Sequence, residues 1–155
     1  MMSREEIIRQ AASGNPFAET FLRAYVGRAH WLDDLVDEPR HPCCEVLARH
    51  EAEWLQQLTG NPFFTANSAR LVPLMLTGLN AWVDSNRMPP GPVRDVLKAQ
   101  WHELVHAVAL VTGGWDALRK LTRSGREYDF ETVPIAHLPP AITEPAKGGF
   151  NGVVR

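Results

Sequence analysis

The chain has 155 residues, 45% of them hydrophobic and 22% charged, which is enough to bury one core. Its net charge of -2 and pI near 6.3 exclude the clustered positive charge with which proteins bind nucleic acids or anionic membranes. No apolar run approaches the roughly 20 residues that cross a bilayer, and no secretory signal is evident, so we expect a cytoplasmic protein.

Local signals predict four helices in the first 85 residues. Ser3 begins a capping box, and Asn15 and Asn61 each stand before a proline, as a capping residue does before the first helical turn. The predicted helices cover residues 3–14, 15–38, 42–58 and 61–85, the last with a kink at Pro73. Apolar residues at positions 18, 22, 25, 29, 32 and 36 predict the core-facing side of the second helix.

The sequence after residue 85 predicts a further long helix and an extended arm. A Pro-rich turn at residues 88–92 precedes a helix predicted over 92–112, and a short helix at 116–122 follows. No alternating strand pattern is present. We therefore expect an all-α fold, an antiparallel bundle of four long helices in a domain of residues 1–130, with a Pro- and Gly-rich arm at residues 131–155.

Three short patterns recur in the same order, roughly 46 to 53 residues apart. Gly-Asn-Pro-Phe occurs at residues 14–17 and 60–63, a Trp-x-Asp pattern at 31–33 and 82–84, and His-Glu at 50–51 and 102–103. The recurrence predicts two helical hairpins related by a pseudo-two-fold axis. The alternative is that helix ends reuse the same residues without duplication.

Three potential metal ligands, His30, Asp33 and Asp37, share one flank of the second predicted helix. In the next helix, Glu51 lies within an apolar stripe, where a carboxylate is unfavourable unless it is paired or binds a metal. These four residues predict a site for Mg²⁺ or another divalent cation. If the protein is an enzyme, we expect this metal to assist a reaction of a phosphorylated small molecule. The alternative for Glu51 is a buried ion pair with an arginine or a hydrogen bond with a tryptophan indole.

The segment Asp33-Asp34-Leu35-Val36-Asp37-Glu38 resembles the first aspartate-rich motif of the class I isoprenoid synthases, notably the squalene and phytoene branch. In that all-helical family the first and last aspartates of the motif coordinate magnesium bound to a diphosphate. The resemblance therefore implies Asp33 and Asp37 as metal ligands. The chain is much shorter than those enzymes, and residues 80–85 match their second metal-binding helix only loosely.

A second candidate metal site lies at residues 102–106. His102, Glu103 and His106 match the His-Glu-x-x-His pattern of zinc peptidases, in which two histidines bind Zn²⁺ and the glutamate activates water. Glu127 is the nearest third ligand, but no substrate-binding sheet is predicted. The same residues match one Glu-x-x-His unit of ferritin-like di-metal bundles, whose second unit is missing because position 54 is a tryptophan.

A non-catalytic role is the competing class of function. A helical bundle with five tryptophans and an extended arm is typical of an assembly subunit, whose arm orders on a protein partner or on a second copy. The Asn-Pro-Phe helix starts and residues 126–131 resemble those of small helical proteins of tailed phages, which implies host cytoplasm or virion but no activity. A catalytic site requires Asp33, Asp37 and Glu51 to converge around a pocket, whereas an assembly subunit leaves them dispersed.

Overall fold

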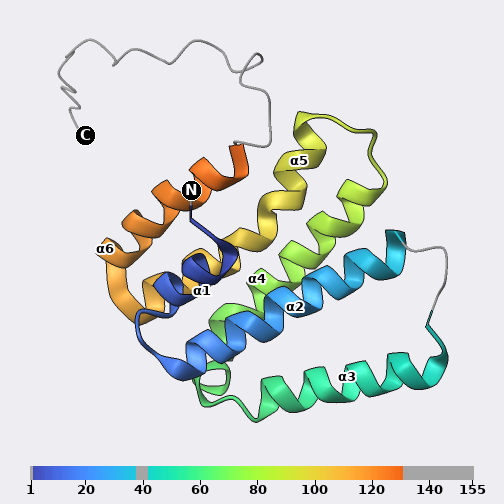
Figure 1. Ribbon diagram of the computed structural model, residues 1–155, viewed down its shortest axis with the longest axis horizontal. Coiled ribbons are helices and arrows are strands. Elements are labelled where there is room, and N and C mark those ends of the chain that lie inside the picture. Colours follow the sequence, from blue (N-terminus) through green and yellow to red (C-terminus); the bar gives the residue numbers. More distant parts are fainter. Residues whose placement is uncertain (1, 38–41, 131–155) are drawn as a thin grey trace, which may run out of the picture.

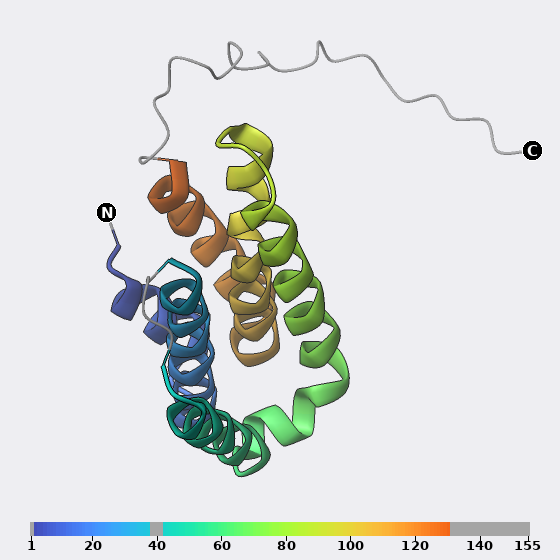
Figure 2. The ribbon, with the colours of Figure 1, turned by 90° about the vertical axis from the view of Figure 1, so that its right-hand side faces the viewer.

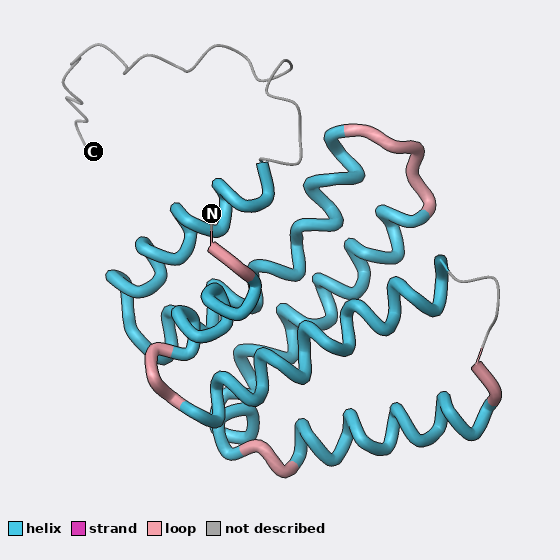
Figure 3. Tube along the Cα trace, viewed as in Figure 1, coloured by secondary structure: helices cyan, strands magenta, loops and turns pink. Residues whose placement is uncertain are grey.

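The computed structural model describes residues 2–37 and 42–130, with side chains as far as residue 122, and this part of the chain contains helices and no strand (Figures 1 and 3). The elements are α1 (Arg4–Ala12), α2 (Pro16–Asp37), α3 (Cys44–Thr59), α4 (Pro62–Asn86), α5 (Pro92–Lys98), the 3-10 helix η1 (Ala99–Trp101) and α6 (His102–Phe130). The all-α prediction is confirmed. The four-helix antiparallel bundle stays a prediction, and the arm at residues 131–155 lies outside the described residues.

The helix starts form as their local sequences predict. Ser3 and Glu6 complete the capping box, with the Glu6 amide donating to Ser3 Oγ at 3.2 Å and the Ser3 amide donating to Glu6 Oε2 at 2.6 Å. Asn15 Oδ1 accepts from two amides at the start of α2, at 3.0 and 3.1 Å. Asn61 Oδ1 accepts from the Phe64 amide at 3.0 Å. Because these bonds satisfy amides that the helix itself leaves unpaired, the side chains set where each helix begins.

The prediction of one helix over residues 92–112 is wrong. α5 ends at Lys98, η1 turns the chain, and α6 begins at His102. The break brings the Trp101 backbone against Gly78 of α4, where an added Cβ would lie 3.7 Å from Trp101 Cα. A kink at Gly114, with φ 71° and ψ -163°, follows the predicted helix end at residue 112, but the helix after it continues to residue 130 instead of ending near 122.

The core lies where α1, α2, α4 and α6 meet. α1 packs mainly against α6, and the Thr112 hydroxyl donates to the Ala11 carbonyl at 2.6 Å. Alanines at this contact let the helices approach closely. The buried hydrophobic residues are Ile8, Ala11, Ala12, Ala18, Phe21, Leu22, Tyr25, Val26, Leu58, Phe63, Leu71, Ala81, Leu104, Val105, Val108, Ala109 and Leu121. The predicted seam of α2 is therefore buried in its first half, whereas Val36 at its end is 54% exposed.

α3 lies at the edge of the molecule, alongside α2 (Figures 1 and 2). Leu58 is its one buried residue among those described, and Leu55 is 57% exposed. The apolar stripe expected to bury Glu51 is consequently not buried as a whole, because α3 has neighbours on one side only. Figure 2 also shows that α4 bends in its first half, which contains Pro73. Proline has no N–H to donate to the preceding turn, and its ring crowds that turn.

The recurring patterns have partly different contacts in their two copies. The two Asn-Pro starts share capping, and Asn61 Nδ2 also donates to the Phe17 carbonyl at 2.9 Å, which joins the starts of α4 and α2. The two tryptophans differ: Trp31 stacks on His50, while the Trp82 indole donates to Asp33. The pseudo-two-fold relation stays a prediction.

Candidate functional site

Arg28 in α2 connects this helix to α3 at Glu51, one of the predicted metal ligands. Its guanidinium forms an ion pair with Glu51, and its Nη1 lies 3.0 Å from Nδ1 of His50. The same guanidinium lies 4.6 Å above the ring of Trp31, which stacks on His50 with 3.7 Å between centroids. Arginine has no acceptor, so the His50 Nδ1 must accept this hydrogen bond. Glu51 thus has an arginine partner, although its side chain is 47% exposed instead of buried.

Asp33 also has a partner, on a third helix. The indole Nε1 of Trp82 in α4 donates to Asp33 Oδ1, while Asp37 is exposed at the end of α2. Within residues 2–37 and 42–122, no three His, Cys, Asp or Glu side chains are grouped so as to hold a metal ion. The Mg²⁺ site at His30, Asp33, Asp37 and Glu51 stays a prediction. Thermal unfolding with and without Mg²⁺ tests it, because a cation that binds only the folded chain raises the unfolding temperature.

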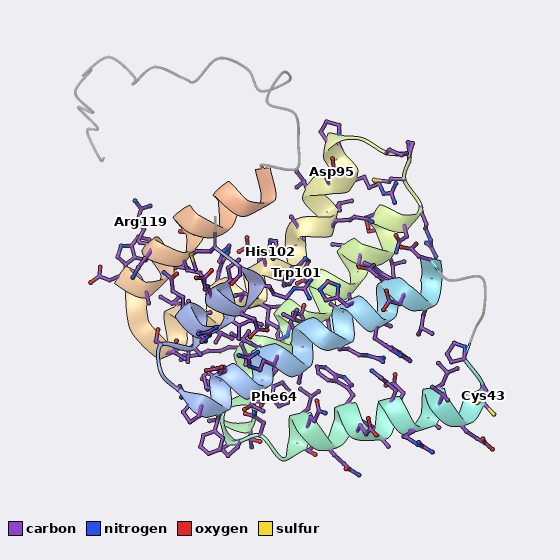
Figure 4. The ribbon with its side chains drawn as sticks, viewed as in Figure 1. Cys43, Phe64, Asp95, Trp101, His102 and Arg119 are labelled. Carbon is purple, nitrogen blue, oxygen red and sulfur yellow. The ribbon has the colours of Figure 1, made fainter. Side chains whose placement is uncertain are left out.

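The histidines of the zinc pattern lie one turn apart at the start of α6. His106 Nδ1 lies 3.6 Å from Glu103 Oε1, and the His102 ring lies 3.8 Å from that of Trp101. Figure 4 shows Trp101 and His102 next to each other in the middle of the molecule. The side chain of Glu127, the expected third ligand, lies outside the described side chains. The Zn²⁺ site at His102 and His106 likewise stays a prediction.

A pocket of about 460 Å³ lies between α2, α3, α4 and the α5–η1 segment. Its volume falls within the range of small-molecule sites. Aliphatic side chains of α2 and α4 form much of its wall. Its tyrosine and tryptophan lining consists of Tyr25, Trp54, Trp82 and Trp101, one from each of the four segments. The sequence signals that bear on this pocket are the high tryptophan content and Gly78, but neither predicts that these rings meet.

Tyr25 supplies the most buried polar group of the pocket wall. Its side chain is 8% exposed, and burial raises the pKa of Tyr25 to about 12. The hydroxyl forms no hydrogen bond with any residue that the structure describes. It lies 3.5 Å from the position that a Cβ on Gly78 would occupy, which is an ordinary van der Waals contact between α2 and α4. A ligand in the pocket therefore meets a hydroxyl that can donate or accept a hydrogen bond.

Charged side chains also line this pocket. Asp33 and the ion-paired Arg28 line it from α2, together with the ring of His30. Lys98, at the end of α5, also lines it and is exposed. Neither His30 nor Lys98 pairs with another residue in the described part of the chain. The pocket thus combines apolar walls with a small number of available polar groups, which is the usual composition of a ligand site.

Comparisons with known proteins found no relative of this chain. Neither a family model, nor a curated protein, nor a solved structure matches this chain. Among the helices that the structure describes, none combines the length and the apolar character needed to span a bilayer.

Proposed function

We propose that this protein binds a small organic molecule with an apolar body and a polar group that hydrogen-bonds to Tyr25. The observation that carries the proposal is the unused hydroxyl of a phenol that is 8% exposed and lines a pocket of about 460 Å³. A ligand group that pairs with this hydroxyl gains one hydrogen bond, which contributes about 0.5–1.5 kcal/mol.

The aromatic walls support an apolar or aromatic ligand body. Indole and phenol rings offer large rigid surfaces that lose little conformational entropy on binding. Leu76 and Leu79 also line the pocket and are 61% and 44% exposed, so a ligand that covers them removes apolar surface from water. At the rim, Lys98 favours a ligand whose polar group is an acceptor or an anion.

The probe for this function is 1-anilinonaphthalene-8-sulfonate, an aromatic anion whose fluorescence increases in apolar sites. We expect the folded chain to bind it, and Leu76→Asp to weaken binding by at least about tenfold because the variant places a carboxylate on the apolar wall. The matched control is Leu110→Asp, which changes an exposed leucine outside the pocket wall. The expected change in that control is less than about twofold.

Tyr25→Phe tests the polar anchor separately from the apolar walls. It removes one hydroxyl and keeps the ring, so we expect probe binding to weaken by about fivefold, the value of one ordinary hydrogen bond. Equal binding by the Leu76→Asp and Leu110→Asp variants would overturn the proposal. Far-ultraviolet circular dichroism verifies that each variant is helical.

A further inference from the structure

We propose that the pocket contains a cation subsite at Asp33, and that its ligand is a small organic ammonium compound with an oxygen acceptor at its other end. This inference rests on the proposed function, because it names the chemical class of the ligand that the same pocket takes. Three observations support it: a carboxylate without a cationic partner, tryptophan rings in the same wall, and the spacing between Asp33 and the Tyr25 hydroxyl.

Asp33 is a charged group of the pocket wall that has no counter-ion. Its half-buried carboxylate accepts a hydrogen bond at Oδ1 from the neutral indole of Trp82. It forms no ion pair with any residue in the part of the chain that the structure describes. A carboxylate that has lost part of its hydration is stabilised by a nearby cation. Because the indole bonds to one oxygen only, Oδ2 can receive a cation from the pocket.

The tryptophans of the wall favour an organic cation. Trp54, Trp82 and Trp101 line the pocket together with Asp33. The face of an aromatic ring attracts a cation electrostatically, and tryptophan gives the strongest interaction of this kind. An alkylated ammonium also carries methyl groups, whose burial against indole rings is favourable in itself. A hydrated metal ion offers no apolar surface, so this wall favours the ammonium group.

The positive groups of the pocket leave this preference in place. Arg28 forms an ion pair with Glu51, which compensates its charge. Lys98 is exposed at the end of α5, where water and salt screen its charge. His30 also lines the pocket, so binding is measured at about pH 8, above the usual titration range of histidine. The uncompensated charge that a ligand meets inside the pocket is therefore that of Asp33.

α2 and α4 lie side by side and set the distance between the two polar ends of the ligand (Figure 1). The Tyr25 hydroxyl lies next to Gly78, and the Asp33 carboxylate bonds to Trp82. Gly78 and Trp82 are one helix turn apart, which is roughly 6 Å along α4. A ligand that places an ammonium group at Asp33 and an oxygen at Tyr25 separates the two by about four methylene groups.

The test compares two probes of the same shape, (4-hydroxybutyl)trimethylammonium and its uncharged carbon analogue 5,5-dimethylhexan-1-ol. Binding is followed by the Trp82 indole N–H signal in proton–nitrogen NMR spectra, because that group bonds to Asp33. We expect the parent to bind the ammonium probe about tenfold more tightly than the alcohol. Asp33→Asn keeps an acceptor oxygen and removes the charge, so it should bind the two probes within about twofold of each other.

Asp34→Asn is the matched control, because it removes the neighbouring charge at an exposed position outside the pocket wall. It should keep the parental preference for the ammonium probe. Equal binding of the two probes by the parent, or no binding of the ammonium probe, overturns the inference. A preference of undiminished size in Asp33→Asn also overturns it.

The sulfonate probe separates this inference from the proposed function. If the parent has no preference for the ammonium probe but Leu76→Asp still weakens binding of 1-anilinonaphthalene-8-sulfonate, the pocket function stands without the cation subsite. If Leu76→Asp binds the sulfonate as Leu110→Asp does, the proposed function fails and the inference fails with it.

Discussion

The indole Nε1 of Trp82 in α4 donates a hydrogen bond to Oδ1 of Asp33 in α2, 49 positions earlier in the chain. Both residues line the pocket. Asp33 therefore does more than present a charge to solvent: it orients an aromatic wall of the proposed binding site. Asp34, the next residue, is exposed.

Asp33→Ala should destabilise the protein, because it leaves the half-buried Trp82 N–H without its acceptor. We expect the free energy of unfolding to fall by about 1–3 kcal/mol, measured by urea denaturation. Asp33→Asn retains an acceptor oxygen and should lose less. Asp34→Ala is the matched control and should stay within about 0.5 kcal/mol of the parent. A parental stability for Asp33→Ala would show that the bond contributes nothing.

Arg28→Ala should loosen α3. Its side chain is 17% exposed and contacts Glu51, His50 and Trp31, whereas α3 contributes one buried residue among those described. We expect faster amide hydrogen exchange in α3 than in the parent, with α1 unchanged. Arg49→Ala, an exposed arginine of α3, is the control. Exchange in α3 at the parental rate would contradict this role.

Stability should decrease between pH 10 and pH 12 through Tyr25. The buried phenol has its pKa raised from 10.0 to about 12, so the unfolded chain loses this proton first. Below pH 10 the phenol is neutral in both states and the stability is unaffected. As the pH rises through the window, ionisation favours the unfolded chain by up to about 2–3 kcal/mol.

The comparison that isolates this effect is Tyr25→Phe against the parent. Other groups titrate in both proteins, so the difference between their unfolding free energies at pH 10 and at pH 12 reports on Tyr25 alone. A difference that does not change with pH would show that the phenol ionises equally well in the folded protein.

Gly114→Ala should destabilise the kink in α6. Gly114 has φ 71° and ψ -163°, a conformation that residues with a Cβ rarely adopt. We expect a loss of about 1–3 kcal/mol, measured by thermal or urea unfolding. Gly27→Ala is the matched control, because that exposed helical glycine has open space around it and an alanine should stabilise α2 by up to about 1 kcal/mol. Equal effects of the two substitutions would contradict the strain argument.

The helices and most of their starts were predictable from the sequence because the responsible bonds are local. Ser3, Asn15 and Asn61 each bond to amides two or three residues further along the chain. Residues so close in sequence meet whatever the rest of the molecule does. The apolar spacing in the first half of α2 was informative for a related reason, since one helix face must turn to the core.

Only the tertiary structure decided which side chains meet. The ion pair of Arg28 with Glu51 and the bond of Trp82 with Asp33 join different helices, so no spacing within a helix predicts them. Nor could periodicity show that α3 has neighbours on one side, that η1 interrupts the helix expected over residues 92–112, or that Tyr25 is left with an unused hydroxyl. Sequence patterns set local conformation, whereas a pocket depends on how helices distant in sequence pack together.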